Sequence, residues 1–378
     1  MNNDYIYAEN MTVGYGKTPL IKEIEIHVRR GEIVTLIGPN GAGKSTILKS
    51  IIRQLDLLAG TVYLAGGPMS MMSEQQIAKR MSVLMTERIH PELMTCEDVV
   101  GTGRYPYTGR LGILRKEDHK KVQEALELVQ AGELASQDFM TVSDGQKQRI
   151  LLARAICQEP EAIVLDEPTS FLDIRHKLEL LTILKNLVRE KKVAVLMSLH
   201  ELDLAQKLSD YIICVKQNAI ERCGTPEEIF RSSYIADLYG ITKGSYQAEL
   251  GCLEMVAVKG RPKVFVIGGN GSGIPVYRRL QRQGIPFAAG ILHENDIDYP
   301  VAKALAVEVV SEAPFELIRE ETYERAAALL KTCGQVICCL SEFGTLNEKN
   351  RLLSRLRTEP VEIMHPGCDV SLDINYES

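Results

Sequence analysis

Residues 38–46 constrain the fold of this chain more than any other segment. They read Gly-Pro-Asn-Gly-Ala-Gly-Lys-Ser-Thr and fit the pattern G-x-x-x-x-G-K-[ST]. Small residues let backbone amides turn inward around phosphate groups, and a helix that follows offers its positive N-terminal end. An apolar stretch at 33–37 precedes the segment, and Ile47, Leu48 and Ile51 follow it at helical spacing. These features predict a phosphate-binding loop between a buried strand and a helix.

The residue types within this loop indicate separate tasks. Lys44 is expected to reach the β- and γ-phosphates of a nucleotide, and the Ser45 hydroxyl is expected to take one position around Mg²⁺. The predicted nucleotide-binding residues of the loop are Gly38, Pro39, Asn40, Gly41, Ala42, Gly43, Lys44, Ser45 and Thr46. A phosphate-binding loop alone indicates a nucleotide-binding fold and no particular reaction.

Two adjacent carboxylates follow a second apolar stretch. Residues 162–165 are Ala-Ile-Val-Leu, and Asp166 and Glu167 come next. A buried strand would deliver both acids to the carboxyl edge of a parallel sheet, where α/β folds bind their ligands. Asp166 would then hold Mg²⁺, and Glu167 would polarise the attacking water as a general base. Taken alone, the pattern fits a strand that ends in a solvated acidic turn equally well.

Three further segments resemble those of a known family. Residues 142–149 resemble the signature of ATP-binding cassette (ABC) proteins, L-S-G-G-Q, with Ser143, Gly145 and Gln146 in agreement and Asp144 in place of a glycine. Residues 170–173 are similar to the family's D-loop. His200 follows the strand-like stretch 193–198 and is similar to the switch histidine that contacts the γ-phosphate.

The resemblance covers residues 3–240 and implies a fold and a reaction. The fold would be the α/β P-loop NTPase cassette, with a RecA-like core and a helical subdomain, and the reaction would be ATP hydrolysis with Mg²⁺. Tyr15 matches the aromatic residue that stacks on adenine. The implied catalytic residues are Lys44, Glu167 and His200, the implied metal ligands are Ser45 and Asp166, and the signature residues that would bind nucleotide are Ser143, Gly145 and Gln146.

The family's dimer arrangement has a consequence for partners. Each ATP lies between the phosphate loop of one subunit and the signature of another, so a second nucleotide-binding subunit is required, most simply an identical copy. One departure concerns the glutamine that the family places after the strand leading into the helical subdomain. Thr86 falls at that position here, with Glu87 beside it, and either side chain could bridge to Mg²⁺ or its water.

Residues 99–108 resemble a segment of one transporter class. They contain Gly103-Arg104-Tyr105-Pro106, which looks like the G-R-x-P stretch of ATPases that serve importers of iron–siderophores, haem and cobalamin. The resemblance implies membrane-spanning permease subunits, an extracytoplasmic substrate-binding protein and uptake of a metal chelate of the iron–siderophore class. A structural turn is the plain alternative for the segment. The alternative functions are a cobalamin or haem importer ATPase and a soluble ABC ATPase that serves as an assembly factor.

Composition favours a peripheral subunit. The formal net charge of −6 argues against a nucleic-acid partner, which usually requires a basic surface. No apolar run approaches the roughly 20 residues that cross a bilayer, so a membrane role requires a partner. The polar start of the chain and the nine scattered cysteines predict reduced thiols and a location at the cytoplasmic face of the cell membrane.

The C-terminal part lies outside this resemblance. We expect a nucleotide-binding domain at 1–242, a linker at 243–262 and a second domain at 263–378. Strand-like and helical stretches alternate in the second domain, which predicts a small Rossmann-like parallel α/β fold. The predicted strands are 263–267, 287–292, 308–310, 335–340 and 361–364.

Residues 268–273 follow the first of these strands and read Gly-Gly-Asn-Gly-Ser-Gly. They do not fit G-x-G-x-x-G, and no lysine follows. This loop would share one sheet edge with 293–296 and 341–344, the edge at which such folds bind ligands. We hypothesise a regulatory domain that senses a nucleotide or the imported chelate, and a tight turn that binds nothing is an equal alternative.

Overall fold

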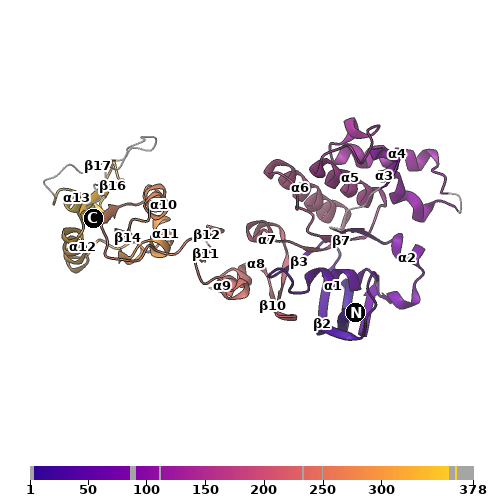
Figure 1. Cartoon of the computed structure of the whole chain (residues 1–378), viewed down its shortest axis with the longest axis horizontal. Coiled ribbons are helices and arrows are strands. Elements are labelled where there is room, and N and C mark those ends of the chain that lie inside the picture. Colours follow the sequence, from indigo (N-terminus) through magenta and orange to yellow (C-terminus); the bar gives the residue numbers. More distant parts are fainter. Residues whose placement is uncertain are drawn as a thin grey trace. The chain divides into compact units, whose positions relative to one another are not determined.

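The computed structural model describes residues 4–85, 91–109, 112–231, 234–248, 250–356 and 362–363. The chain forms two compact units, Met1–Tyr239 and Gly240–Ser378 (Figure 1). We expected the second domain to begin at residue 263, whereas the second compact unit also includes residues 240–262.

Two sheets make up the core of the first unit. An antiparallel sheet has the order β2-β1-β4-β5, and a six-stranded sheet has the order β10-β9-β3-β8-β7-β6. The strands are β1 (Asp4–Tyr15), β2 (Thr18–Arg29), β3 (Ile33–Ile37), β4 (Ala59–Leu64), β5 (Gly67–Pro68), β6 (Met81–Leu84), β7 (Ala162–Asp166), β8 (Ala194–Ser198), β9 (Tyr211–Lys216) and β10 (Ala219–Gly224). In the second sheet only β10 runs antiparallel to its neighbour.

Burial explains the two strand types. Every residue of β3, β7 and β8 is buried, which is typical of central parallel strands covered on both faces. In β2, buried and exposed residues alternate from Ile24 onward, so this strand turns one face to the core. One apolar cluster joins both sheets and helix α1 (Lys44–Ile51).

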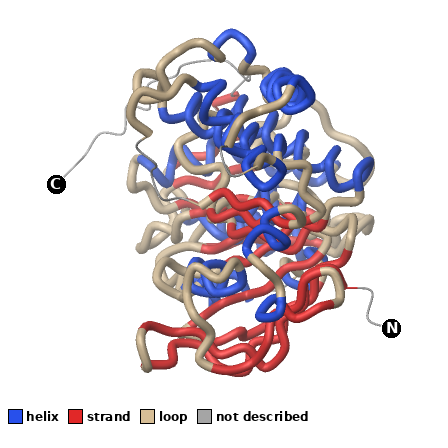
Figure 2. Tube along the Cα trace, turned by 90° about the vertical axis from the view of Figure 1, so that its right-hand side faces the viewer, coloured by secondary structure: helices blue, strands red, loops and turns tan. Residues whose placement is uncertain are grey.

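Besides α1, the first unit contains α2 (Glu74–Ala78), α3 (Cys96–Gly101), α4 (Lys116–Leu128), α5 (Asp144–Cys157), α6 (Ile174–Lys191), α7 (Leu202–Leu208), α8 (Pro226–Ile229) and α9 (Tyr234–Tyr239), with 3₁₀ turns at Met69–Met71, Thr102–Tyr107 and Gly132–Leu134. Helices α3, α4, α5 and α6 gather at the end of this unit away from the antiparallel strands, whereas α8 and α9 lie beside β10, as Figure 1 shows. Figure 2 shows the strands and helices from the side. A RecA-like sheet with a separate helical part is the architecture that the sequence predicted.

The second unit contains a parallel sheet of order β15-β14-β13-β16-β17. Its strands are β13 (Val264–Ile267), β14 (Phe287–His293), β15 (Glu308–Glu312), β16 (Gln335–Cys338) and β17 (Glu362–Ile363). Its helices are α10 (Ile274–Arg282), α11 (Asp298–Leu305), α12 (Glu320–Thr332) and α13 (Glu348–Ser354). This order, with the first strand in the middle, is that of a Rossmann-like fold and confirms the predicted class.

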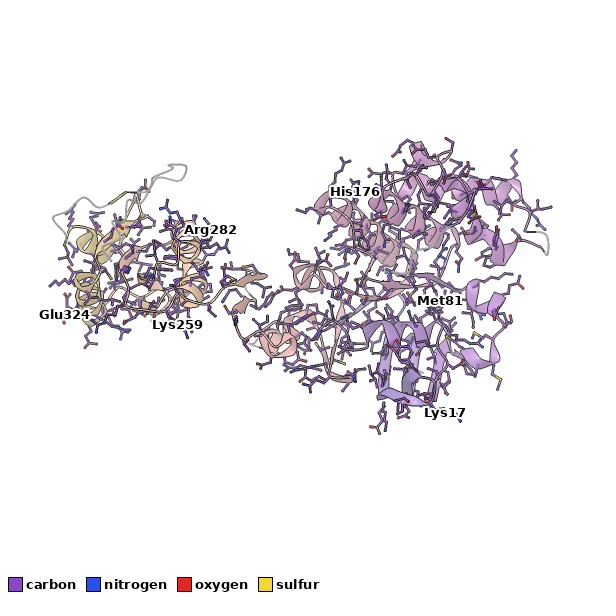
Figure 3. All side chains as sticks on the ribbon, in the orientation of Figure 1. Lys17, Met81, His176, Lys259, Arg282 and Glu324 are labelled. Carbon is purple, nitrogen blue, oxygen red and sulfur yellow. The ribbon has the colours of Figure 1, made fainter. Side chains whose placement is uncertain are left out.

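The two faces of this sheet bury different residues of β13. Val264 and Val266 pack against α10 and α11, whereas Phe265 and Ile267 pack on the side of α12. Helices α10 and α12 therefore cover opposite faces of the sheet. In Figure 3, Arg282 of α10 and Glu324 of α12 lie on opposite sides of the unit.

The segment 243–262, expected to be a linker, contains secondary structure. Strands β11 (Ser245–Gln247) and β12 (Cys252–Glu254) pair antiparallel. Glu254 is 7% exposed and accepts a 3.0 Å hydrogen bond from Nε of Arg278 on α10. An ion pair between the buried Glu254 carboxylate and the half-exposed Arg278 guanidinium therefore ties β12 to α10 within the second unit.

Candidate active site

The loop at 38–46 connects β3 to α1 and needs glycine at defined places. Gly38, Gly41 and Gly43 have φ of 146°, 77° and 104°, which L side chains rarely adopt. A Cβ on Gly38 would lie 2.0 Å from the Val215 carbonyl oxygen, and one on Gly43 would lie 2.6 Å from the Ile21 side chain. The loop is therefore packed closely against β9 and β2.

Lys44 begins α1 and is 5% exposed. Its Nζ donates hydrogen bonds of 2.7 Å and 3.0 Å to the carbonyl oxygens of Gly38 and Pro39. Burial lowers the pKa of Lys44, and the nearby carboxylates of Glu167 and Asp166 oppose that shift. A cation held inside the loop and facing two acids is suited to a polyphosphate–metal ligand.

Ser45 and Asp166 come together as the sequence predicted. The Ser45 hydroxyl donates a 3.2 Å hydrogen bond to Oδ1 of Asp166 at the end of β7. A hydroxyl and a carboxylate are the hard oxygen donors that Mg²⁺ prefers, and Mg²⁺ usually adds water and phosphate oxygens to so few protein ligands. Within the described ranges, no group of three or more His, Cys, Asp or Glu could hold a metal alone. These two residues therefore fit a Mg²⁺ ion that arrives with a nucleotide.

Glu167 follows Asp166 with φ of 49°, a strained value for a residue other than glycine. The backbone amide of Glu167 donates a 3.0 Å hydrogen bond to the Ser198 hydroxyl. The Glu167 carboxylate is hydrogen-bonded to Nε2 of His200 and accepts a 3.2 Å bond from the Ser170 hydroxyl. The structure thus places the predicted base and the predicted switch histidine in direct contact.

Tyr15 lies beside the phosphate loop. Its hydroxyl shares a 3.1 Å hydrogen bond with the Thr46 hydroxyl, and the residue is 59% exposed. An exposed ring at the edge of the loop can stack on a base, which is the role that the resemblance implied.

The signature residues Ser143, Gly145 and Gln146 occupy the start of α5. Ser143 caps the helix, accepting from the Gln146 amide at 3.3 Å, while the Gln146 side chain accepts from the Ser143 amide at 2.8 Å. Gly145 lies against the Phe171 and Leu172 segment. Thr86 and Glu87, the expected replacements for the missing glutamine, lie outside the described residues.

Arg104 of the G-R-Y-P segment faces inward. Its guanidinium bonds Asp118 at 2.9 Å, the Cys157 carbonyl at 2.8 Å and Glu159 at 3.0 Å, and it stacks on the Tyr107 ring. Only Tyr105 among these residues is exposed, at 55%. Tyr105 lines a hollow of about 550 Å³ that also includes Leu93, Met94 and Leu114. The segment thus combines a buried brace with one exposed aromatic ring.

Two residues near the site have contacts that the sequence analysis did not predict. Ser198 is the last residue of β8 and lies opposite Asp166 of β7, and its position at the end of the predicted strand 193–198 was the available signal. Tyr239 carried no signal, because its hydroxyl reaches the Gly38 amide across 201 residues of chain.

The glycine-rich loop of the second unit is closed by acids. The Asn270 amide donates to both oxygens of Asp296, at 3.1 and 2.9 Å. The Gly273 and Ile274 amides donate to Asp298 at 2.9 and 3.2 Å. The predicted meeting of 268–273 with 293–296 is therefore seen, and the amides that could have held a phosphate hold carboxylates.

Among the described residues, no helix is both long and apolar enough to cross a membrane.

Comparisons with known proteins identify two parts. A family model described as "ABC transporter" matches residues 21–170, and a model of the MJ0874 family matches residues 287–366. The ABC transporter ATP-binding protein MJ0873 of Methanocaldococcus jannaschii, described as uncharacterized, is 40% identical over 289 residues, which cover 75% of this chain and 99% of the relative.

Relatives with a named cargo include two classes of importer. The iron(3+)-hydroxamate import protein FhuC of Bacillus subtilis is 37% identical over 62% of this chain and 87% of its own length. The cobalamin import protein BtuD of Halobacterium salinarum is 30% identical over 81% of this chain and 78% of its own length. The dimeric structure of the ABC transporter cassette MJ0796 superposes with a TM-score of 0.53 at 25% identity, over 58% of this chain and 98% of that one.

Proposed function

This chain belongs to the ATP-binding proteins of ABC transporters, and we propose that it powers the uptake of a metal chelate of the iron–siderophore class. It is the ATPase subunit of an ABC importer. The convergence of Lys44, Asp166, Glu167 and His200 carries the mechanistic part of the proposal. The relatives that import iron–hydroxamate and cobalamin support the class of cargo.

The chemistry assigned to each residue follows from its contacts. Lys44 and the loop amides bind the phosphates, and the Ser45 hydroxyl and the Asp166 carboxylate hold Mg²⁺. Bound Mg²⁺ would supply charge neutralisation of the phosphate oxygens. Glu167 orients the attacking water and accepts its proton, and His200 beside it contacts the γ-phosphate.

A second copy of the cassette completes the site. Ser143 caps its own helix and Gly145 lies against Phe171 and Leu172, and the ligand that we propose for both is the nucleotide of another subunit. Exposed apolar side chains near the D-loop, Phe171 at 64% and Ile174 at 80%, support a surface that becomes covered on association. The dimeric structure of the similar cassette MJ0796 agrees with this arrangement, and a homodimer is the simplest form.

The membrane partner is proposed to contact the hollow at Tyr105. An exposed aromatic ring beside a recess that combines apolar side chains with the acids Glu97 and Asp98 suits a short amphipathic segment of a permease subunit at the cytoplasmic face of the membrane. An extracytoplasmic binding protein would deliver the chelate to that permease. A soluble assembly ATPase is the alternative, and cobalamin and haem are the alternative cargoes.

A pull-down of the tagged chain from native membranes in detergent, followed by mass spectrometry, tests the importer assignment. Recovery of a polytopic permease is expected, and recovery of soluble partners alone would favour the assembly factor. ATP-driven uptake by proteoliposomes that contain the recovered complex then tests the cargo. We expect a ferric hydroxamate to be taken up, and preferential uptake of cobalamin or haem would replace the iron–siderophore assignment.

A further inference from the structure

Tyr239 connects the last helix of the first unit to the first residue of the phosphate loop. The Gly38 amide donates a 3.0 Å hydrogen bond to the Tyr239 hydroxyl. Tyr239 ends α9, and Gly38 follows directly after β3. The contact therefore joins the loop entrance to the place where the first unit ends.

Helix α9 is firmly held to the first unit. Ile235 and Leu238 are 0% and 1% exposed. The Tyr234 hydroxyl donates a 3.1 Å hydrogen bond to Glu221, and the Arg222 guanidinium lies 5.0 Å from the centre of the Tyr234 ring. Because its two apolar residues are buried and Tyr234 contacts β10, this short helix gives the Tyr239 hydroxyl a fixed support.

Gly38 is constrained from three directions. Its amide bonds Tyr239, its carbonyl oxygen accepts from Lys44 at 2.7 Å, and its Cα packs so closely on Val215 that a Cβ would lie 2.0 Å from that carbonyl oxygen. A displacement of the Gly38 peptide therefore changes the acceptor that holds Lys44. Lys44 is the loop's phosphate-binding cation, so the position of Gly38 bears on nucleotide affinity.

The residue after Tyr239 belongs to the second unit. Gly240 has φ of 63°, and a Cβ built on it would meet nothing within 4 Å. Such an open glycine lets the chain change direction with little steric cost. The position of Tyr239 therefore depends on the contacts of the first unit.

We propose that Tyr239 is a positioning residue for ATP binding, which holds the entrance of the phosphate loop. Burial raises the pKa of Tyr239 to about 12, although the Gly38 amide lowers it in part. The hydroxyl therefore stays neutral in the physiological range, and the connection is mechanical rather than a pH switch. The inference rests on the proposed nucleotide-binding role of residues 38–46.

The substitution Tyr239→Phe in the full chain removes the hydroxyl and keeps the ring. One hydrogen bond of this kind corresponds to a change of roughly 2- to 12-fold in an equilibrium constant. We expect KM for ATP, and Kd for a fluorescent ATP analogue with Mg²⁺, to rise by about that factor while kcat stays within about twofold. Tyr234→Phe, on the same helix but bonded to Glu221, is the matched control and should leave both constants unchanged.

A four-residue Gly-Ser insertion after Gly240 is a second control, because it leaves the contact between Tyr239 and Gly38 in place. It should leave KM for ATP unchanged. Unchanged KM in Tyr239→Phe would overturn the proposal. Lys44→Ala separates the two levels of inference: if it retained full ATP affinity, the loop assignment itself would fail.

Discussion

The Ser198 hydroxyl donates a 2.6 Å hydrogen bond to Oδ1 of Asp166, its partner across the β7–β8 pair. The Ser198 hydroxyl oxygen also accepts a 3.0 Å hydrogen bond from the backbone amide of Glu167. One buried serine thus orients both the proposed metal ligand and the strained residue that carries the proposed base. Groups behind a metal ligand commonly control how well that ligand works.

Ser198→Ala is expected to weaken Mg²⁺-dependent hydrolysis without unfolding the cassette. Loss of a supporting hydrogen bond to a metal ligand typically costs 10- to 100-fold in metal affinity or activity, and we expect a decrease of about that size. The ATPase rate measured against Mg²⁺ concentration should show a higher half-saturation value. Ser209→Ala is the control, because Ser209 donates a 2.7 Å bond to Thr35 in the same sheet. A Mg²⁺ curve identical to that of the wild-type chain would show that Ser198 does not orient Asp166.

Glu167→Gln should abolish turnover and preserve ATP binding. The amide has nearly the same shape as the carboxylate but cannot accept a proton from water, and it removes one charge that faces the γ-phosphate. We expect hydrolysis to fall by at least about 100-fold and an ATP-bound dimer to persist in gel filtration. Glu201→Gln is the control, because Glu201 bonds Thr169 and Lys177 instead. If Glu167→Gln hydrolysed ATP at the wild-type rate, another group would be the base.

The local parts of the site could be predicted from the sequence. Residues 38–46 and the pair Asp166–Glu167 each lie at the end of one apolar strand, so a pattern of adjacent residues determines their place. The contacts of Ser198 and Tyr239 could not be predicted, because they depend on how distant elements pack. Helices α4 and α5 are likewise separate elements because Gln130 adopts φ of 53° and Ser143 caps a new helix.

The second unit shows the same limit. Its strand order follows from alternating apolar stretches, and the model confirms the fold. The closing of its glycine-rich loop by Asp296 and Asp298 depends on the turn after β14, and glycine spacing alone carries no information about it. In the segment 243–262, the short strands of β11 and β12 have too few residues for a recognisable period.

Arg104→Ala is predicted to destabilise the helical part of the cassette. The Arg104 and Asp118 side chains are 9% and 8% exposed, so removal of the cation leaves a buried carboxylate without its opposite charge. Breaking such a pair typically costs about 3–5 kcal/mol, which urea denaturation would detect. Arg104→Lys should recover only part of the loss, because an ammonium cannot bond Asp118, Glu159 and the Cys157 carbonyl with the same planar geometry.

Tyr105→Ala is the matched change on the exposed side of the same segment. It should leave the urea midpoint of the chain unchanged and weaken association with the permease or its stimulation of ATPase activity. A stability loss equal to that of Arg104→Ala would contradict the division of this segment into a buried brace and an exposed contact.

Acid is predicted to destabilise the second unit through Glu312. Burial alone would raise the pKa of this carboxyl, but hydrogen bonds from the Arg319 amide and guanidinium and from the Thr322 hydroxyl outweigh burial and lower the pKa to about 2. A lowered pKa contributes stability above the ordinary value of 4.5, and that contribution is lost as pH falls toward 2.

Melting of the full chain between pH 5 and 2, followed by a probe in the second unit, would measure this loss. Glu312→Gln should be less stable at pH 7 and should show a flatter dependence on pH. Glu308→Gln removes an ion pair with Arg325 whose partners are 41% and 61% exposed, and it should change the pH profile little. Parallel profiles for wild type and Glu312→Gln would refute the assignment.

The loop at 268–273 is predicted not to bind nucleotide phosphates. Burial raises the pKa of Asp298, and the hydrogen bond from the Gly273 amide lowers that pKa in part. Its carboxylate and that of Asp296 already take the amides that a phosphate would need, and an added phosphate would meet like charge. Tyr277 explains two of the glycines, because a Cβ on Gly268 or Gly273 would lie 2.5 or 2.4 Å from its hydroxyl.

Calorimetric titration of ATP into full-length Lys44→Ala, in which the cassette loop is disabled, should therefore show no binding. Residual saturable binding that Asp298→Asn abolishes or strengthens would place a nucleotide at this loop and restore the nucleotide-sensing hypothesis, whereas its absence leaves the chelate as the ligand to test.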